Sequence, residues 1–387
     1  MRFLFASDSF KGTLKSERTI ELLTRAAREV FGEVECCGIP VADGGEGTVD
    51  AVVAAEHGTW IQAEVSGPLL GKRVRASYGK LDGKRAILEM AAASGLTLVP
   101  AALRNPLLTS SYGTGELIRH ALDQGFTEIS IAIGGSATND GGMGCARALG
   151  IRFLDSSGNE LEGRGQDLEN VAAIDCAGLD PRIRHTKITV MCDVTNPLCG
   201  PDGATWTFGA QKGATPEMQA RLESGMINYR DVIRRQFGVD PDQIRGAGAA
   251  GGLGTALMVF LGGEMRSGID TVLDLIGFDE RLKDVDLVVT GEGRTDWQSC
   301  FGKVMQGVGE RAEAKGVVAV GLSGSLGPDA AQIFHHGIAS LMTTVDAPMP
   351  LEEALERAEE LYYLGALRMF RFLKAGMMLQ KSSDGRE

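Results

Sequence analysis

Hydrophobic and polar positions follow two different periods along the first fifty residues. Residues 2–7 and 34–42 are short apolar runs, which favour β-strands. Residues 16–31 repeat apolar positions at the three-to-four spacing of an amphipathic helix. A strand, a helix and a second strand in this order predict a βαβ unit with two parallel strands.

The same order returns in the last third of the chain. Apolar runs at 285–293 and 317–324 flank a helical pattern at 303–315, and a long helical pattern follows at 351–374. The middle of the chain differs. Residues 66–90 alternate in short pieces around an L-D-G-K turn, which predicts an antiparallel hairpin.

The sequence therefore predicts an α/β protein with two domains. The first is a Rossmann-like domain with a doubly wound parallel sheet, and it is discontinuous, built from residues 1–66 and 281–387. An inserted α/β domain with antiparallel strands spans residues 67–280. We expect the active-site cleft between them. A chain of 387 residues accommodates this, because domains of about 100 to 200 residues are usual.

Composition and charge narrow the choice of partners. A net charge of −12 argues against nucleic acid and membrane surfaces, and we expect a monomer or a homodimer. The apolar stretch 251–263 is shorter than the roughly 18 residues of a membrane span and predicts a buried helix. Charged residues interrupt the N-terminal apolar run too early for a secretory signal, which predicts a cytoplasmic protein. The seven cysteines include no C-x-x-C pair, so we expect reduced thiols.

Five predicted strands end in loops that carry acidic and amide side chains. These loops are SDSFKG (7–12), VADGGEGTVD (41–50), IGGSATNDGG (133–142), CDVTNPLCG (192–200) and TGEGRTDWQS (290–299). In open α/β sheets, ligands bind outside the carboxyl ends of the strands. We therefore expect the five loops to meet in one crevice.

The residue types in these loops indicate an anionic ligand and a divalent cation. Glycine-rich loops between a strand and a helix present backbone N–H groups to anions such as phosphate. An exposed helix N-terminus contributes only about 0.3–1 kcal/mol, too little for a nucleoside triphosphate without a metal ion. The candidate oxygen ligands for magnesium are Asp43, Glu46, Asp140, Asp193, Glu292 and Asp296. The candidate cations on the same loops are Lys11, Arg294 and Lys303.

Familiar nucleotide-binding motifs do not fit. GAGAAG at 246–251 matches G-x-G-x-x-G, but the polar segment 240–245 before it is no strand, so the motif predicts a helix packed closely through its glycines. The chain has no G-x-x-x-x-G-K-[ST] motif and no protein-kinase motif set. Two other classes stay open: an NAD-dependent 2-hydroxyacid dehydrogenase, although SDSFKG supplies only one glycine, and a sugar-acid-binding regulatory protein, although no basic DNA-binding segment is evident.

Eight motifs, in order along nearly the whole chain, resemble the bacterial-type (type 1) glycerate kinase family. They are DSFKGTL (8–14), PVADGGEGTVDA (40–51), AILEMAAASGL (86–96), SYGTGELI (111–118), IGGSATNDGGMG (133–144), CDVTNPLCGPDGA (192–204), GAAGGLG (248–254) and TGEGRTDWQS-x-x-GK (290–303). The resemblance implies ATP- and Mg²⁺-dependent phosphorylation of D-glycerate in a cleft between the two domains. It favours 2-phosphoglycerate as the product, with 3-phosphoglycerate as the alternative.

Roles for individual residues follow from phosphoryl transfer, in which positioning and charge neutralisation dominate. The expected triphosphate contacts are Gly134, Gly135, Ser136, Thr138, Asn139, Gly141, Gly142 and Lys303. The expected glycerate contacts are Asp8, Ser9, Lys11, Asp43 and Arg294, and the expected magnesium ligands are Asp43, Glu46, Asp140, Glu292 and Asp296. Lys11 and Arg294 would hold the glycerate carboxylate or the transferring phosphoryl group. Asp193, flanked by apolar strand residues, would activate the acceptor hydroxyl, with Asp43, Glu292 and Asp296 as competitors.

Overall fold

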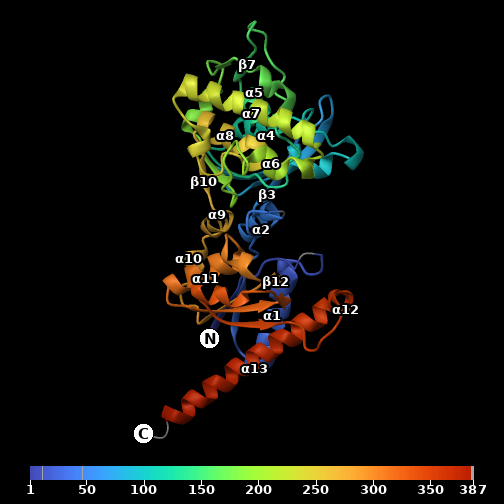
Figure 1. Cartoon of the computed structure of the whole chain (residues 1–387). Coiled ribbons are helices and arrows are strands. Elements are labelled where there is room, and N and C mark those ends of the chain that lie inside the picture. Colours follow the sequence, from blue (N-terminus) through green and yellow to red (C-terminus); the bar gives the residue numbers. More distant parts are fainter. Residues whose placement is uncertain (11, 46, 385–387) are drawn as a thin grey trace. The chain divides into compact units, whose positions relative to one another are not determined.

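The computed structural model describes residues 1–10, 12–45 and 47–384, with side chains up to residue 379 (Figure 1). The chain divides into two compact units. The first comprises Met1–Asp43, Ala54–Glu56 and Ile269–Glu387, and the second comprises Gly44–Val53 and His57–Gly268. The chain thus leaves the first unit and later returns to it.

Five parallel strands form the main sheet of the first unit. Their order is β15-β13-β11-β1-β2, and each neighbouring pair is parallel. The strands are β1 (Arg2–Phe5), β2 (Glu35–Gly38), β11 (Leu287–Thr290), β13 (Val318–Ser323) and β15 (Ile338–Thr343). The order runs outward from β1 in both directions, so the predicted doubly wound parallel sheet is confirmed.

Helices cover this sheet through aromatic and aliphatic side chains. Helix α1 (Ser16–Phe31) packs against α13 (Ala358–Asp384), and both share one core with β1. The ring of Phe3 stacks on that of Phe370, with centroids 5.8 Å apart. Helix α11 (Val304–Ala314) packs against β11, β13 and β15. Burying apolar surface in this way supplies most of the favourable free energy of folding.

The second unit contains a six-stranded mixed sheet in the order β10-β9-β6-β5-β4-β3. Its strands are β3 (Thr59–Ser66), β4 (Arg73–Lys80), β5 (Arg85–Glu89), β6 (Glu128–Ala132), β9 (Lys187–Met191) and β10 (Glu264–Arg266). The predicted hairpin is confirmed, because β4 and β5 pair antiparallel. Strand β3 pairs with β4 along its whole length and so belongs to this sheet, whereas the predicted boundary at residue 66 placed it in the first domain. Periodicity identifies a strand but does not reveal its pairing partner.

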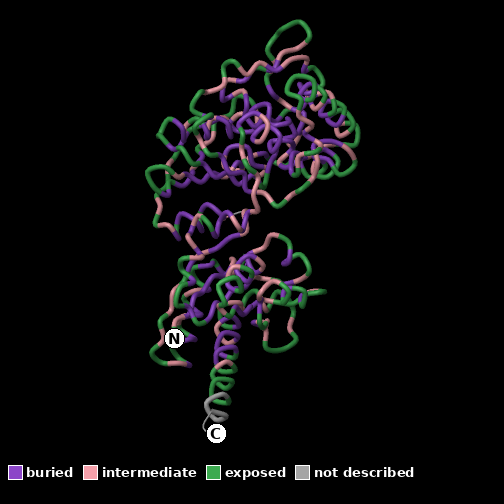
Figure 2. The backbone as a smooth tube through the Cα atoms, turned by 90° about the vertical axis from the view of Figure 1, so that its left-hand side faces the viewer, coloured by how far each residue is buried: buried purple, intermediate pink, exposed green. Residues whose placement is uncertain are grey.

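The helices of the second unit are α3 (Ala91–Ser94), α4 (Tyr112–Asp123), α5 (Met143–Ala148), α6 (Ala204–Phe208), α7 (Pro216–Phe237) and α8 (Ala249–Thr255). Helix α2 (Thr48–Ala55) is divided between the two units, whereas α9 (Gly268–Leu275), apart from its first residue, and α10 (Phe278–Arg281) belong to the first unit. Two short strand pairs remain. In the second unit, β7 (Arg152–Leu154) pairs antiparallel with β8 (Ala173–Asp175). In the first unit, β12 (Arg294–Thr295) pairs parallel with β14 (Ser325–Leu326). Buried residues concentrate in the middle of each unit (Figure 2). No described helix has the length and apolar character needed to cross a membrane.

The glycine-dense segment of the second unit is not one regular helix. Ala250, Gly251 and Gly252 have left-handed backbone angles inside α8, and a π-helix follows at Ala256–Phe260. A Cβ on Gly251 would lie 2.0 Å from the carbonyl oxygen of Thr138. The glycines therefore allow two backbone segments to pack against each other, as the GAGAAG motif predicts. The buried helix predicted for 251–263 is present but irregular, with left-handed residues at its start and a π-helix up to Phe260.

Candidate active site

A cavity of about 710 Å³ lies in the first unit, at the carboxyl ends of its parallel strands. Each strand of the main sheet contributes a following loop to the lining: Asp8 after β1, Asp43 after β2, Glu292 after β11, Ser325 after β13 and Val345 after β15. The volume is within the range of about 300–1,000 Å³ that small-molecule sites occupy.

The cavity includes the point at which the strand order reverses. Strand β1 has β2 on one side and β11 on the other, and the backbone N–H of Asp8 donates to the carbonyl of Gly291 at 2.9 Å. Loops diverge at such a switch point and leave room for a ligand between them. Asp8 and Glu292 are therefore placed where this fold class binds its ligands.

The described candidate residues of the first unit all line this one cavity. They are Asp8, Ser9, Asp43, Glu292, Arg294, Asp296 and Lys303. Lys11 and Glu46 lie outside the described residues. Three of the five acidic loops thus contribute to this cavity, whereas the loops at 133–142 and 192–200 belong to the second unit, so the meeting of all five in one crevice stays a prediction.

Lys303 and Asp43 form the closest charged pair in the cavity. The Lys303 ammonium lies 2.6 Å from the Oδ2 of Asp43, and Lys303 is the N-cap residue of α11. Burial lowers the pKa of Lys303, but the hydrogen bond and charge of Asp43 raise it more, so the net shift is upward. Lys303 therefore stays protonated and gives the site a fixed positive charge.

Glu292 is a partly buried carboxyl group that lines the cavity. Its Oε1 accepts a hydrogen bond of 3.0 Å from the Thr295 hydroxyl, which also lies 2.6 Å from the Ser323 hydroxyl. Burial raises the pKa of Glu292, and the charge of Asp8 raises it further. A carboxylate with a raised pKa and fixed neighbours is suited to accept a proton.

Arg294 and Asp296 lie at the rim. The Arg294 side chain is 61% exposed, and its Nε lies 3.4 Å from the Oδ2 of Asp296. Asp296 also caps a short 3₁₀ turn, since its Oδ1 accepts from the backbone N–H of Gln298 at 2.9 Å. An exposed guanidinium can turn towards an entering anion at little cost.

The carboxylates of the cavity can be compared with the ligand sets that bind Mg²⁺ in proteins. Within the described part of the chain, no group of three or more His, Cys, Asp or Glu side chains is arranged to hold a metal ion. Mg²⁺, however, commonly takes one or two carboxylates and completes its shell with phosphate and water oxygens. The hard oxygen donors Asp8 and Glu292, near enough to influence each other's charge, fit that mode.

Asp140 has a structural role rather than the expected role of metal ligand. The carboxylate is fully buried in the second unit, and its Oδ2 accepts from the backbone N–H and hydroxyl of Ser111, both at 2.7 Å. The N–H groups of Gly142 and Gly144 also donate to it. Burial raises the pKa of Asp140, against the effect of these donors. Asp140 thereby joins the starts of α4 and α5, and its oxygens are occupied from within the unit.

Most of the glycine-rich loop is also internal. Thr138 and Asn139 are fully buried, and a Cβ on Gly142 would lie 2.4 Å from that of Ala256. Only Gly134 and Gly135 of the loop are exposed. The expectation that the whole loop faces a triphosphate is therefore wrong for Gly141 and Gly142, whose lack of a side chain is explained by backbone packing.

Lys212 is a residue that the sequence analysis missed. Its ammonium is buried and donates to the Thr138 carbonyl at 2.7 Å. Burial lowers its pKa to about 7, against the opposing charge of Asp140. The Thr138 hydroxyl and the Asn139 amide oxygen are buried there without a hydrogen-bond partner among the described residues. The sequence around Lys212, Q-K-G, contains no pattern from which the burial of this lysine could be predicted.

Asp193 does not have the environment expected of a base. Its side chain is exposed, and its Oδ1 accepts from the backbone N–H of Gly268 at 3.0 Å, at the start of α9. The burial that was to raise its pKa is therefore missing.

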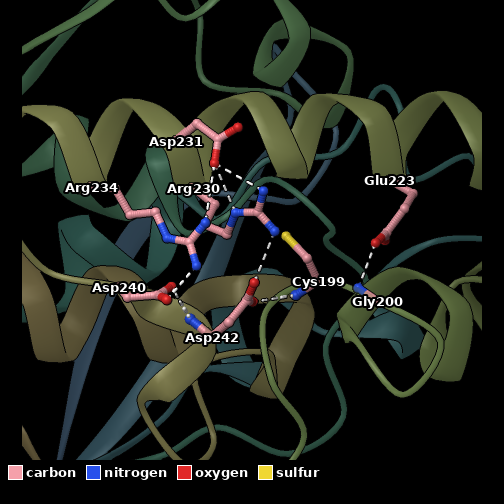
Figure 3. Close-up of polar contacts among 8 residues, drawn as sticks. All are labelled: Cys199, Gly200, Glu223, Arg230, Asp231, Arg234, Asp240 and Asp242. Carbon is pink, nitrogen blue, oxygen red and sulfur yellow. Dashed lines mark hydrogen bonds and ion pairs between the residues drawn. The ribbon is translucent and has the colours of Figure 1, made fainter.

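The loop that follows Asp193 is held by hydrogen bonds from its backbone to the carboxylates of Asp242 and Glu223 (Figure 3). The N–H of Cys199 donates to Asp242 at 2.9 Å, and that of Gly200 donates to Glu223 at 2.6 Å. Arg230 contacts Asp242 at 3.0 Å. Burial raises the pKa of the Cys199 thiol, which keeps it protonated, and all seven cysteines are free, as predicted. This cluster fixes the loop and leaves no reactive group.

The protein has a parallel α/β sheet with acidic and basic side chains around a cavity at its switch point. This arrangement is typical of an enzyme that acts on a small charged substrate. The model of the glycerate kinase family matches residues 3–374, so the chain belongs to this family. A glycerate kinase of Bacillus subtilis is 46% identical over 93% of this chain and 94% of its own length, and a glycerate 2-kinase of Escherichia coli is 46% identical over 92% and 94%.

The solved structures agree with the family assignment. A crystal structure assigned to a glycerate kinase 2 of Salmonella typhimurium LT2 superposes with a TM-score of 0.88 at 45% identity, covering 98% of this chain and 99% of that one. The predicted family resemblance is confirmed. The dehydrogenase and the regulatory protein, which composition left open, are wrong alternatives.

Proposed function

We propose that this protein phosphorylates D-glycerate with ATP, and that the reaction takes place at the cavity of the first unit. The observation that supports this most directly is the convergence of Asp8, Asp43, Glu292, Arg294 and Lys303 on one cavity at the switch point. Two cations suit a carboxylate and a phosphoryl group, and the acids suit a hydroxyl proton and a metal-bound nucleotide.

Each group has a proposed task. Arg294, exposed at the rim, and Lys303, fixed by Asp43, bind the glycerate carboxylate and the transferring phosphoryl group. Glu292 accepts the proton of the attacking hydroxyl, which Asp193 was expected to do. The hydroxyl oxygen then forms a bond to the γ-phosphorus, the bond from that phosphorus to the β,γ-bridging oxygen breaks, and ADP leaves. The proton passes from Glu292 to solvent.

Magnesium fits this scheme as part of the nucleotide complex. Asp8 is the proposed carboxylate contact, since Glu292 is assigned to the proton of the hydroxyl, and the ion would neutralise charge on the phosphate oxygens. Lys11 and Glu46 remain proposed contributors on sequence grounds alone. The exposed Gly134 and Gly135, with Ser136, remain proposed N–H and hydroxyl donors to phosphate. A cytoplasmic location is likewise proposed.

A coupled assay of ADP formation tests the activity. Purified protein with ATP and Mg²⁺ should form ADP with D-glycerate and much more slowly with L-glycerate, lactate or glycolate. Phosphorus NMR of the product then distinguishes 2-phosphoglycerate, which we favour, from 3-phosphoglycerate. Glycerate-independent ADP formation, or none with any hydroxy acid, would contradict the proposal.

A further inference from the structure

The cavity of the first unit has a second, apolar part that the proposed chemistry of glycerate and phosphate does not use. Its lining residues follow β15 or lie on α12 (Leu351–Glu356): Val345, Ala347, Pro348, Met349, Leu351 and Leu355. None of these side chains is charged or offers a hydrogen bond of ordinary strength. A three-carbon hydroxy acid and a triphosphate both require polar contacts, so neither explains this wall.

The wall is exposed in a way that indicates a missing partner. Leu351 is 73% exposed and Leu355 is 47% exposed, although both line a cavity. Each square ångström of apolar surface removed from water contributes about 25 cal/mol, so a flat apolar ligand would gain affinity here. Polar residues of the same cavity, Lys303 and Asp43 among them, would receive the charged part of that ligand.

The backbone holds the wall in place. Met349 lies between Pro348 and Pro350, whose rings fix φ near −65° and also restrict the residue before each of them. Pro350 is the N-cap residue of α12, and its carbonyl accepts from the N–H of Ala354 at 3.1 Å. A wall with few accessible conformations loses little entropy when a ligand binds.

We propose that this wall, formed by the six apolar residues named above, binds the base of the nucleotide, while its phosphates extend towards Lys303. The inference rests on the proposed kinase function and assigns the nucleotide end of the cavity. A purine is planar and apolar on both faces, and aliphatic and thioether side chains pack well against such rings. The cavity volume of about 710 Å³ has room for a nucleotide beside glycerate, whereas glycerate alone would leave most of it empty.

Calorimetric titration of ADP and of inorganic tripolyphosphate into the parent and three variants tests the proposal. Met349→Asp should weaken ADP binding at least tenfold and leave tripolyphosphate binding within twofold of the parent. Met378→Asp is the matched control, because Met378 is 65% exposed on α13 and does not line the cavity. Leu355→Asp, on a side chain that is already half exposed, should repeat the effect of Met349→Asp.

Turnover measurements separate this inference from the proposed function. In Met349→Asp the KM for ATP should rise at least tenfold, with the kcat at saturating ATP and the KM for glycerate unchanged. Unchanged ADP affinity in both wall variants, or an equal loss of tripolyphosphate binding, would overturn the nucleobase site. If the parent binds ADP through the wall but shows no glycerate-dependent turnover, the kinase proposal fails and the nucleobase site stands.

Discussion

Glu292 and Asp193 offer a direct comparison of two carboxylates that the sequence alone does not rank. Glu292→Gln keeps the size and the hydrogen bond to Thr295 but removes the proton acceptor, so kcat should fall by about 10²–10⁴-fold. The KM for ATP should stay within threefold. Because burial raises the pKa of Glu292, the parent should also lose activity as the pH falls through that raised value, and the variant should lack this acid limb.

Asp193→Asn is the matched control for that experiment. Asp193 is exposed and caps the start of α9, so its variant should keep at least a third of the parent kcat. A hundredfold loss in Asp193→Asn with an active Glu292→Gln would return the role of base to Asp193. Steady-state kinetics on both proteins between pH 5 and 9 gives the answer.

Lys212 should make the stability of the fold depend on pH. Its pKa is lowered from 10.5 to about 7 by burial, so between these values the unfolded chain carries a proton that the folded chain lacks. The free energy of unfolding therefore rises with pH across this window, by up to about 1.4 kcal/mol per pH unit. Lys212→Met removes this contribution.

Urea unfolding of the parent and of Lys212→Met at pH 7 and pH 9 measures the effect. The free-energy difference, parent minus variant, should increase by about 2 kcal/mol over these two units. Comparing the two proteins cancels the titration of other groups, such as the buried thiols. If the free-energy difference between parent and variant stays constant with pH, the pKa of Lys212 is not lowered in the folded protein.

At the scale of the element, α8 contains a local strain that substitution can relieve. Ala250 has φ 53° and ψ 37°, a left-handed conformation that costs a residue with a Cβ roughly 1–2 kcal/mol. Ala250→Gly should therefore raise the free energy of unfolding by about 0.5–1 kcal/mol, after the larger entropy of glycine in the unfolded chain is subtracted.

Gly251→Ala is the informative counterpart. Its Cβ would lie 2.0 Å from the Thr138 carbonyl, so the variant should lose roughly 3 kcal/mol or more, since backbone atoms must move apart. Thermal and urea unfolding of both variants at one pH compares them. Equal changes in the free energy of unfolding would contradict the prediction, because the two substitutions are expected to change it in opposite directions.

Elements with a strong hydrophobic period were predictable from the sequence, and those defined by tertiary contacts were not. The 16–31 pattern gave α1 at Ser16–Phe31, because its apolar stripe alone decides its packing. The 351–374 pattern instead breaks at Arg357 into α12 and α13. In the candidate site, chemical type identified Glu292 and Lys303, but the burial of Asp140 and Lys212 depends on neighbours distant in sequence.

At the scale of the whole molecule, each unit has its own sheet and core, so the effect of a ligand can be assigned to one unit. A ligand that binds only the folded protein stabilises it by RT ln(1 + [L]/Kd), which is about 2.7 kcal/mol at one hundred times Kd. Amide hydrogen exchange reports where local opening is suppressed. With saturating ADP and Mg²⁺, protection should concentrate in the segments around residues 8–13, 290–303 and 344–358.

The glycine-rich loop of the second unit is the sensitive comparison in that experiment. Its buried part, including Thr138 and Asn139, should exchange slowly without ligand, so we expect a gain of protection only at the exposed Gly134 and Gly135. Protection of these two amides on addition of ADP would support their proposed contact with phosphate. Protection of this loop with none at 344–358 would contradict the nucleobase wall and would support the glycine-rich loop as a contact of the triphosphate.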